Sequence, residues 1–158
     1  MTTKPSNNKK CGFVAVIGLP NAGKSTLVNL LVGQKVSIVS KKVQTTRSKI
    51  LGISLHESSQ VILIDTPGIF EAKKKLEKAM VHEAFNARAN AEITLLVIDV
   101  KNPNFNFLNK IKDKISNTKL CIALNKIDLI GKEELLKIAS AIKELFLFDQ
   151  IFMISALK

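Results

Sequence analysis

One glycine-rich stretch, "GLPNAGKSTLVN" at residues 18–29, limits what this chain can fold into more than any other part of the sequence. The apolar run "FVAVIG" precedes it and is typical of a strand buried on both faces. The stretch itself opens a segment with helical spacing that closes at Gly33. Strand, glycine-rich loop and helix in this order predict a phosphate-binding loop, and this context argues against a chance glycine-rich turn.

The residues of the loop fit the pattern G-x-x-x-x-G-K-[ST]. Its glycines let successive backbone N–H groups turn toward phosphate oxygens. Lys24 would reach the β and γ phosphates as a catalytic residue, and the Ser25 hydroxyl would ligate Mg²⁺. We therefore predict a nucleotide-binding loop made of Gly18, Asn21, Ala22, Gly23, Lys24, Ser25 and Thr26.

The rest of the chain alternates between buried apolar runs and amphipathic segments. Strands are predicted at residues 13–18, 49–58, 60–65, 93–99, 119–125 and 150–155, and helices at 24–33, 76–91, 105–116 and 133–146. The second and third strands are joined by a short polar turn, which predicts a hairpin. We expect an α/β fold with a mostly parallel six-stranded sheet, one antiparallel strand and helices on both faces. Ligands of such sheets bind beyond the carboxyl ends of the strands.

A second motif, "DTPG" at residues 65–68, follows a predicted strand. Asp65 at the strand end would hold a Mg²⁺-bound water. The Gly68 N–H would meet the γ-phosphate and respond to its loss, so Gly68 is a candidate catalytic residue. Alone the motif would be only a turn, because Pro-Gly is a common turn pair. About forty residues after a phosphate loop, it predicts the metal side of the same site.

A third motif, "NKID" at residues 125–128, also follows a predicted strand. The Asp128 carboxylate would accept hydrogen bonds from the N1–H and the exocyclic amine of guanine, a pattern that adenine cannot present. Asn125 and the stem of Lys126 would fix the base and the neighbouring loops. The predicted base is therefore guanine.

The motif "SALK", residues 155–158, stands after the last predicted strand. A backbone N–H at Ser155, Ala156 or Leu157 would meet the guanine O6. Each four-residue motif is weak in isolation, but three in this order, each at a strand end, point to one nucleotide site.

The composition is basic. The 158 residues carry a formal net charge of +11, and lysine supplies nearly all of the positive charge because Arg47 and Arg88 are the only arginines. A basic surface favours contacts with RNA phosphates, but lysines spread along the whole chain are also typical of a solvated surface. Trp and Tyr are absent, which leaves only phenylalanines for base stacking. Direct RNA binding by this chain is left open.

Neither the apolar runs nor the cysteines indicate export or membrane insertion. No run reaches the length of a membrane span, and the start "MTTKPSNNKK" does not resemble a signal peptide. Cys11 and Cys121 have no partner at metal-ligand spacing, which fits a reducing compartment. We expect a soluble, cytoplasmic protein.

Together with "GQKVSIVSKKVQTTRSKILGI" and "LIDTPGIF", these motifs make the chain resemble the GTPase domain of Era, the bacterial ribosome-assembly GTPase family. The resemblance implies a P-loop NTPase G domain at residues 12–158, preceded by a disordered tail at 1–11. It implies too that the last helix and the KH domain, which binds 16S rRNA in this family, are missing after "SALK". Related GTPases that act on tRNA modification carry an acidic residue where Ser48 stands here, so that type is kept as an alternative.

The resemblance assigns "QTTRS", residues 44–48, to the first switch loop. It implies that Thr46 ligates Mg²⁺ in the GTP state and is a catalytic residue, with Thr45 as the second choice. The plain alternative is a pair of threonines at a strand edge. The expected metal ligands are thus Ser25, Thr46 and Asp65.

Water activation differs from that of the best-known small GTPases. They carry a glutamine after the DxxG glycine, whereas Ile69 stands there and cannot form a hydrogen bond with water. We expect slow intrinsic hydrolysis that is completed by an RNA or protein partner, or by potassium held near Asn21.

The predicted function is a GTP-binding and GTP-hydrolysing molecular switch with Mg²⁺ as cofactor, GTP as substrate and GDP as product. The alternative from another class is a guanine-nucleotide-binding interaction module with negligible hydrolysis. The resemblance implies a monomer whose further partners are 16S rRNA and the 30S subunit through the KH domain. It leaves peripheral association with the inner membrane open.

Overall fold

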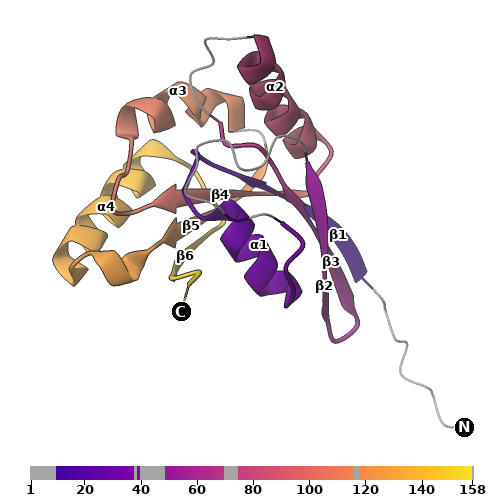
Figure 1. Ribbon diagram of the computed structural model, residues 1–158. Helices are drawn as coiled ribbons and strands as arrows, with labels where there is room; N and C mark the ends of the chain where they lie inside the picture. Colours follow the sequence, from indigo (N-terminus) through magenta and orange to yellow (C-terminus); the bar gives the residue numbers. More distant parts are fainter. Residues whose placement is uncertain (1–9, 38, 40–48, 70–74, 116–117, 158) are drawn as a thin grey trace, which may run out of the picture.

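The computed structural model describes residues 10–37, 39, 49–69, 75–115 and 118–157. Apart from the hairpin of β2 and β3, strands and helices alternate along this part of the chain, as the sequence predicts (Figure 1). In chain order they are β1 Lys10–Ile17, α1 Lys24–Val32, β2 Ile50–His56, β3 Ser59–Asp65, α2 Lys75–Ala89, β4 Ile93–Asp99, α3 Phe105–Ile115, β5 Lys119–Asn125, the 3₁₀ turn η1 Ile127–Leu129, α4 Lys132–Leu145 and β6 Gln150–Ile154.

The strands form a six-stranded sheet in the order β2-β3-β1-β4-β5-β6. Only β2 and β3 pair antiparallel, through the predicted hairpin, and all other neighbours pair parallel. The predicted fold class is therefore confirmed. Because five strands run in the same direction, their carboxyl ends meet at one edge of the sheet.

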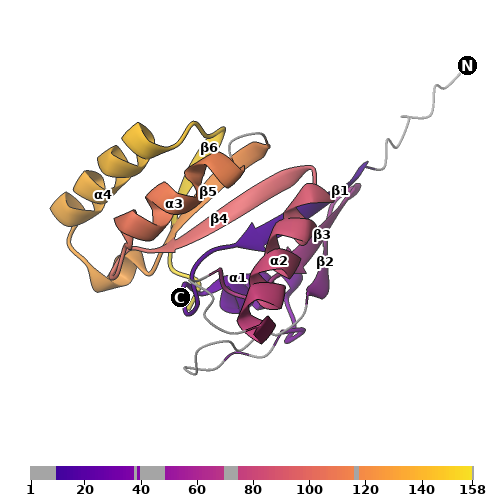
Figure 2. The same ribbon diagram turned by 90° about the horizontal axis from the view of Figure 1, so that it is seen from above.

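The two faces of the sheet carry different helices (Figures 1 and 2). Helix α1 covers one face, where Leu27 and Val28 pack with Val16, Leu63 and Val97. Helices α2, α3 and α4 cover the other face and enclose a larger core. Its members are fully or nearly fully buried aliphatic and aromatic side chains, among them Ile17, Ala84, Leu96, Ile111, Ile122, Ile138 and Ile142. The expectation of helices on both faces is met.

The first strand begins earlier than predicted. Lys10 and Cys11, assigned to the tail on their polarity, pair with Ser59 and Gln60 of β3. The Lys10 N–H also donates to the Ser58 carbonyl at 3.1 Å. Backbone pairing does not depend on the side chain, so a polar or small residue can extend a strand whose partner continues alongside it. The predicted tail boundary at residue 11 is thus too late, and residues 1–9 lie outside the described part.

None of the helices in the described part is long and apolar enough to cross a membrane.

Candidate nucleotide-binding site

The predicted motifs gather at the edge where the parallel strands end. The loop between β1 and α1, the segment after β3, the turn after β5 and the segment after β6 each follow a strand carboxyl end. Hydrogen bonds connect the segment after β3 and the turn after β5 directly to the glycine-rich loop, and they connect the segment after β6 to the end of β5. The site is therefore built from segments that are far apart in the sequence.

The glycine-rich loop delivers the N-terminus of α1 to this edge. Gly23 precedes the helix with a φ of 97°, and a Cβ on it would lie 2.2 Å from Nδ2 of Asn125. A side chain at this position would be both strained and in collision with its neighbour. Helix α1 has no side-chain cap and no acidic residue in its first turn. Its positive end is therefore suited to an anion.

Lys24 is buried at this helix terminus, with 6% of its surface exposed. Its Nζ donates to the carbonyls of Leu19 at 2.9 Å and Gly18 at 3.3 Å. Burial lowers the pKa of the Lys24 ammonium from 10.5 to about 8, and the nearby Asp65 carboxylate offsets part of that shift. A buried ammonium that faces mainly neutral carbonyls is stabilised when phosphate oxygens approach.

The predicted metal ligands Ser25 and Asp65 are in direct contact. The Ser25 Oγ donates to Oδ2 of Asp65 at 2.6 Å, and Asp65 is fully buried at the end of β3. A hydroxyl and a carboxylate are oxygen ligands of the kind that Mg²⁺ prefers. The chemistry of this pair therefore fits the predicted cation. Thr46, the third predicted ligand, and its alternative Thr45 lie outside the described residues.

The segment after β3 packs against the glycine-rich loop. A Cβ on Gly68 would lie 2.7 Å from the backbone nitrogen of Pro20, so only glycine allows this close approach. The N–H of Ile69 donates to the Gly18 carbonyl at 2.9 Å. The Ile69 side chain is 2% exposed and belongs to the larger core. Ile69 thus has a packing role, as its inability to form hydrogen bonds suggests.

Asn125 connects three segments through its side-chain amide. Its Nδ2 donates to the Ala22 carbonyl at 2.9 Å. Its Oδ1 accepts the N–H groups of Lys126 at 2.8 Å and Ala156 at 3.0 Å. The side chain is buried at the end of β5, and both its amide oxygen and its amide nitrogen form hydrogen bonds. The loop expected to read the base is therefore bonded to the glycine-rich loop and to the "SALK" segment.

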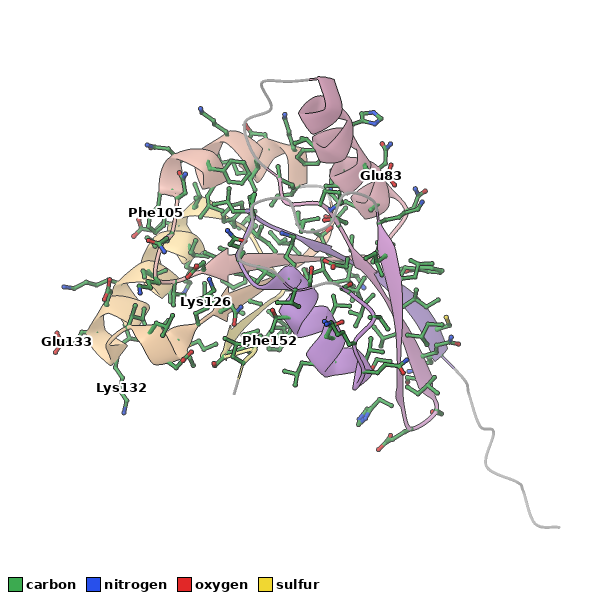
Figure 3. All side chains as sticks on the ribbon, viewed as in Figure 1. Glu83, Phe105, Lys126, Lys132, Glu133 and Phe152 are labelled. Carbon is green, nitrogen blue, oxygen red and sulfur yellow. The ribbon has the colours of Figure 1, made fainter. Side chains whose placement is uncertain are left out.

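Lys126, labelled in Figure 3, forms a second connection to the glycine-rich loop. Its backbone is left-handed, with a φ of 66°, and it precedes η1, which contains the exposed Asp128. The Lys126 Nζ donates to the Asn21 carbonyl at 2.8 Å and to Oδ2 of Asp99 at 2.5 Å. The sequence reading did not include Asp99. A carboxylate at the end of a buried strand, next to the strand that carries "NKID", was the signal for it.

A family model described as 50S ribosome-binding GTPase matches residues 13–126. The chain belongs to this GTPase family.

Relatives of this GTPase include GTPase Era of Bradyrhizobium sp. strain BTAi1, 47% identical over 156 residues, which span 97% of this chain and 50% of the relative. GTPase Era of Agrobacterium fabrum strain C58 is 50% identical over 151 residues, 93% of this chain and 47% of the relative. The expected resemblance to Era is confirmed. The GTPase described here spans about half the length of these relatives.

A solved structure also resembles this GTPase closely. It is that of Era in complex with MgGDPNP and nucleotides 1506–1542 of 16S ribosomal RNA. The TM-score is 0.85 at 37% sequence identity, covering 95% of this chain and 52% of that one. The G-domain fold expected from the sequence is thus the fold of a solved Era.

The remaining predicted residues of this GTPase lie at the same edge. Thr26 follows Ser25 in α1 and is half-buried, and Ser155 is half-buried after β6. Leu157 is 81% exposed. The predicted nucleotide-binding residues thus lie at or next to the strand ends, and Thr46 and its alternative Thr45 lie outside the described residues.

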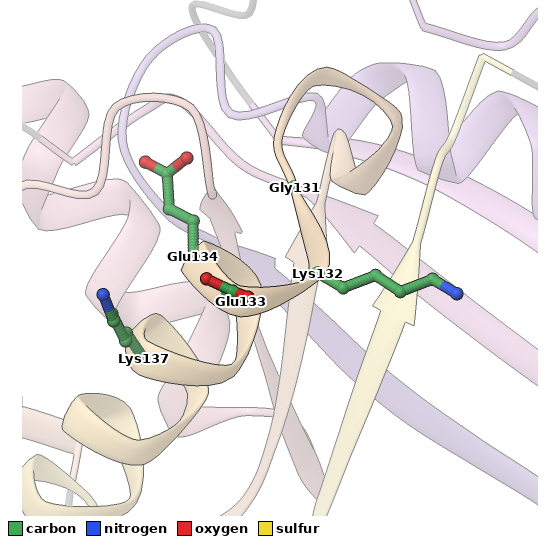
Figure 4. Close-up of a pocket in the computed structure, with 5 residues that line it drawn as sticks. All are labelled: Gly131, Lys132, Glu133, Glu134 and Lys137. Atoms are coloured by element: carbon green, nitrogen blue, oxygen red, sulfur yellow. The ribbon is translucent and has the colours of Figure 1, made fainter.

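A separate depression lies at the start of α4 in this GTPase (Figure 4). It is lined by Gly131, Lys132, Glu133, Glu134 and Lys137. All of these residues are exposed, and their charges are of both signs, so solvent screens them and they mutually compensate. None of the predicted site residues within the described part of the chain lines it.

Proposed function

We propose that this domain binds GTP at the edge where the parallel strands end and hydrolyses it to GDP and phosphate. The observation that carries the proposal is the buried Lys24 ammonium, held on backbone carbonyls at the start of α1 and next to the Ser25–Asp65 pair. An anion with several charged oxygens would satisfy the ammonium and the helix terminus at once. A nucleoside triphosphate is such an anion.

The phosphate side then works by exchange of partners. Lys24 would leave the carbonyls of Leu19 and Gly18 for the β and γ phosphate oxygens. Ser25 and Asp65 would hold Mg²⁺, with Thr46 as a further ligand in the GTP state. When bound, this ion neutralises charge on the β and γ phosphates. The Gly68 N–H, held close to Pro20, would contact the γ-phosphate and lose that contact after hydrolysis.

The base side gives the specificity. Asp128, exposed in η1 just beyond the Asn125 and Lys126 contacts, would accept two hydrogen bonds from guanine. The segment from Ser155 to Leu157 would offer a backbone N–H to the guanine O6. Adenine would leave this carboxylate facing an acceptor and an empty position, so ATP would bind far more weakly.

Water activation needs a group that this chain does not supply at position 69. Ile69 is buried in the core, so its side chain does not face an attacking water. We propose that a potassium ion near the exposed Asn21, or a protein or RNA partner, stabilises the charge that develops between the β and γ phosphates. Comparison of single-turnover hydrolysis in potassium and in sodium, for the wild type and for Asn21→Ala, separates these two routes.

The cellular role is proposed by similarity. The relatives are named GTPase Era, and the solved Era is bound to a segment of 16S ribosomal RNA. We propose that the full protein assists assembly of the small ribosomal subunit in the cytoplasm, with rRNA contacts made through a KH domain. The nucleotide state of the domain described here would control that interaction.

Phosphate release measured with GTP and with ATP tests the proposal. The wild type is expected to release phosphate from GTP only, and Lys24→Ala, checked for folding by circular dichroism, is expected to lose this activity. Near-normal hydrolysis by a folded Lys24→Ala protein would refute the assignment. Tight GTP binding without turnover, with or without potassium and rRNA, would instead favour an interaction module.

A further inference from the structure

Asp99 lies at the carboxyl end of β4 and uses its two carboxylate oxygens differently. It stands opposite Asn125 in the parallel pairing of β4 with β5. Its Oδ1 accepts the backbone N–H of Lys101 at 3.0 Å, which shapes the turn after β4. Its Oδ2 accepts the Lys126 ammonium at 2.5 Å. One oxygen therefore serves the local turn and the other reaches the loop that follows β5.

The Lys126 ammonium is shared between this carboxylate and the glycine-rich loop. It also donates to the Asn21 carbonyl at 2.8 Å. The side chains of Lys126 and Asp99 are 27% and 15% exposed, so solvent screens their attraction only in part. Without the carboxylate, a largely desolvated cation would keep the neutral Asn21 carbonyl as its partner among the described residues. The contact at Asn21 thus depends on the charge of Asp99.

We propose that Asp99 is a positioning residue of the guanine-nucleotide site and that it acts through Lys126. By holding the ammonium on the Asn21 carbonyl, Asp99 fixes the spacing between the phosphate loop and the base-reading loop. It also keeps the Lys126 stem extended along the side on which the base binds. The inference rests on the proposed binding of GTP.

This role predicts which steps depend on Asp99. GDP and GTP share the base, the ribose and the first two phosphates, so both lose the same amount of affinity when the spacing relaxes. Guanine selectivity stays with Asp128, because its carboxylate is unchanged. The rate of hydrolysis at saturating GTP also stays, because Lys24, Ser25 and Asp65 are untouched.

Asp99→Asn distinguishes the contact with the Lys101 N–H from the contact with the Lys126 ammonium. The amide oxygen still accepts the Lys101 N–H, since asparagine supports the same kind of turn. The amide nitrogen, however, faces the Lys126 ammonium as a donor against a donor. We expect a somewhat lower thermal midpoint and about tenfold weaker binding of both GDP and GTP, seen mainly as faster dissociation. A fluorescent guanine nucleotide displaced by excess GDP measures that rate.

Asp149→Asn is the matched control. The Asp149 carboxylate also accepts a backbone N–H, that of Leu120, at 3.0 Å. Asp149 precedes β6, however, and so lies at the amino ends of the strands, away from the site. This variant should keep the dissociation rates of the wild type. A rate increase in the control equal to that of Asp99→Asn would assign the effect to general loss of charge and overturn the proposal.

A double-mutant cycle tests that Asp99 acts through Lys126. Lys126→Met keeps most of the stem and removes the ammonium, so adding Asp99→Asn to it should change dissociation less than twofold. Losses that multiply in the double variant would overturn the proposal, because a purely structural role is independent of the ammonium. A wild type that binds neither GTP nor GDP refutes the proposed function. Tight wild-type binding with an unaffected Asp99→Asn protein refutes only the role of Asp99.

Discussion

The base side and the phosphate side of this site differ in how they are held. On the base side, Asn125 and Lys126 bond to Ala22, Ala156, Asn21 and Asp99, which belong to other segments of the strand-end edge. On the phosphate side, Lys24 bonds to carbonyls of its own loop and Ser25 bonds directly to Asp65. The proposed base side is thus bonded together without a nucleotide, whereas the proposed phosphate side would have to exchange partners to bind one.

This difference assigns two tasks to two parts of one site. A loop fixed in advance pays little conformational entropy on binding and favours selection of the correct base. Groups that change partners when the γ-phosphate arrives or leaves generate a difference between the GTP and GDP states. We infer that the affinity for guanine comes mainly from the base side. The change of conformation between the GTP and GDP states comes mainly from the phosphate side.

Asp128→Asn should give the largest effect, on the base side. Replacing the carboxylate removes two charge-assisted hydrogen bonds to guanine, so GTP binding should weaken by about 3 kcal/mol or more. Xanthine has a carbonyl where guanine has its amine and should bind the variant better than guanine does. Competition between GTP and XTP for a fluorescent nucleotide measures this. Unchanged preference for GTP would place the base elsewhere.

Asn125→Ala should destabilise the nucleotide-free protein itself. The change deprives the Ala22 carbonyl and the Lys126 and Ala156 N–H groups of their partner in a buried place. We expect a loss of about 2–3 kcal/mol in the free energy of unfolding. The ratio of GTP affinities with and without Mg²⁺ should stay near that of the wild type. Denaturant unfolding measures the loss of stability, and nucleotide titration measures the ratio of affinities. An unaltered stability would show that the base side is not preformed.

Ser25→Ala should change the stability of the nucleotide-free protein little and the Mg²⁺ dependence of GTP binding strongly. The hydroxyl contact to Asp65 is lost in the nucleotide-free protein, and its stability should fall by about 1 kcal/mol. The gain in GTP affinity on adding Mg²⁺ should shrink roughly tenfold, the effect of one lost ligand contact. Equal Mg²⁺ dependence in Ser25→Ala and in the wild type would contradict the metal assignment.

The smallest effect should be a pH dependence from Lys24. Because burial lowers its pKa to about 8, the nucleotide-free protein loses this proton as the pH rises through 8. Phosphates favour the charged form, so binding above pH 8 takes up a proton and GDP affinity should fall about fourfold between pH 7 and 8.5. In the unfolded chain the pKa is higher, so this group's contribution to stability increases as the pH rises above 8.

Titration of GDP binding between pH 7 and 9 measures this decrease. Lys24→Gln is the control, because its GDP affinity should keep only the pH dependence that comes from ionisation of guanine itself. Identical pH profiles for the two proteins would show that Lys24 keeps its proton throughout this range.

The positions of the strands could be predicted, and their contacts could not. The structure places β4 and β5 at the predicted residues 93–99 and 119–125, because continuous apolar runs bounded by polar residues indicate buried strands well. The bond between Asp99 and Lys126 depends instead on the register of these two strands. The bond from Asn125 to Ala22 joins residues 103 positions apart. No local pattern contains that information.

The hairpin shows the same limit on a smaller scale. Alternation at residues 49–58 predicts a strand, and β2 is found at Ile50–His56. Leu51, Ile53 and Leu55 are exposed and Ile50 is half-buried, whereas Gly52 packs against Val28 and Val32 of α1. The alternation of residues along β2 indicates that its two faces differ. Which face is covered depends on where helix α1 lies.

Amide hydrogen exchange in the nucleotide-free and the GDP–Mg²⁺-bound protein tests the central claim most directly. The N–H groups of Lys126 and Ala156 donate to Asn125, and we expect them to exchange slowly in both states. The N–H groups of Gly23, Lys24 and Ser25 should become protected only when the nucleotide binds. Fast exchange at Lys126 and Ala156 without nucleotide, followed by protection on binding, would contradict a preformed base side.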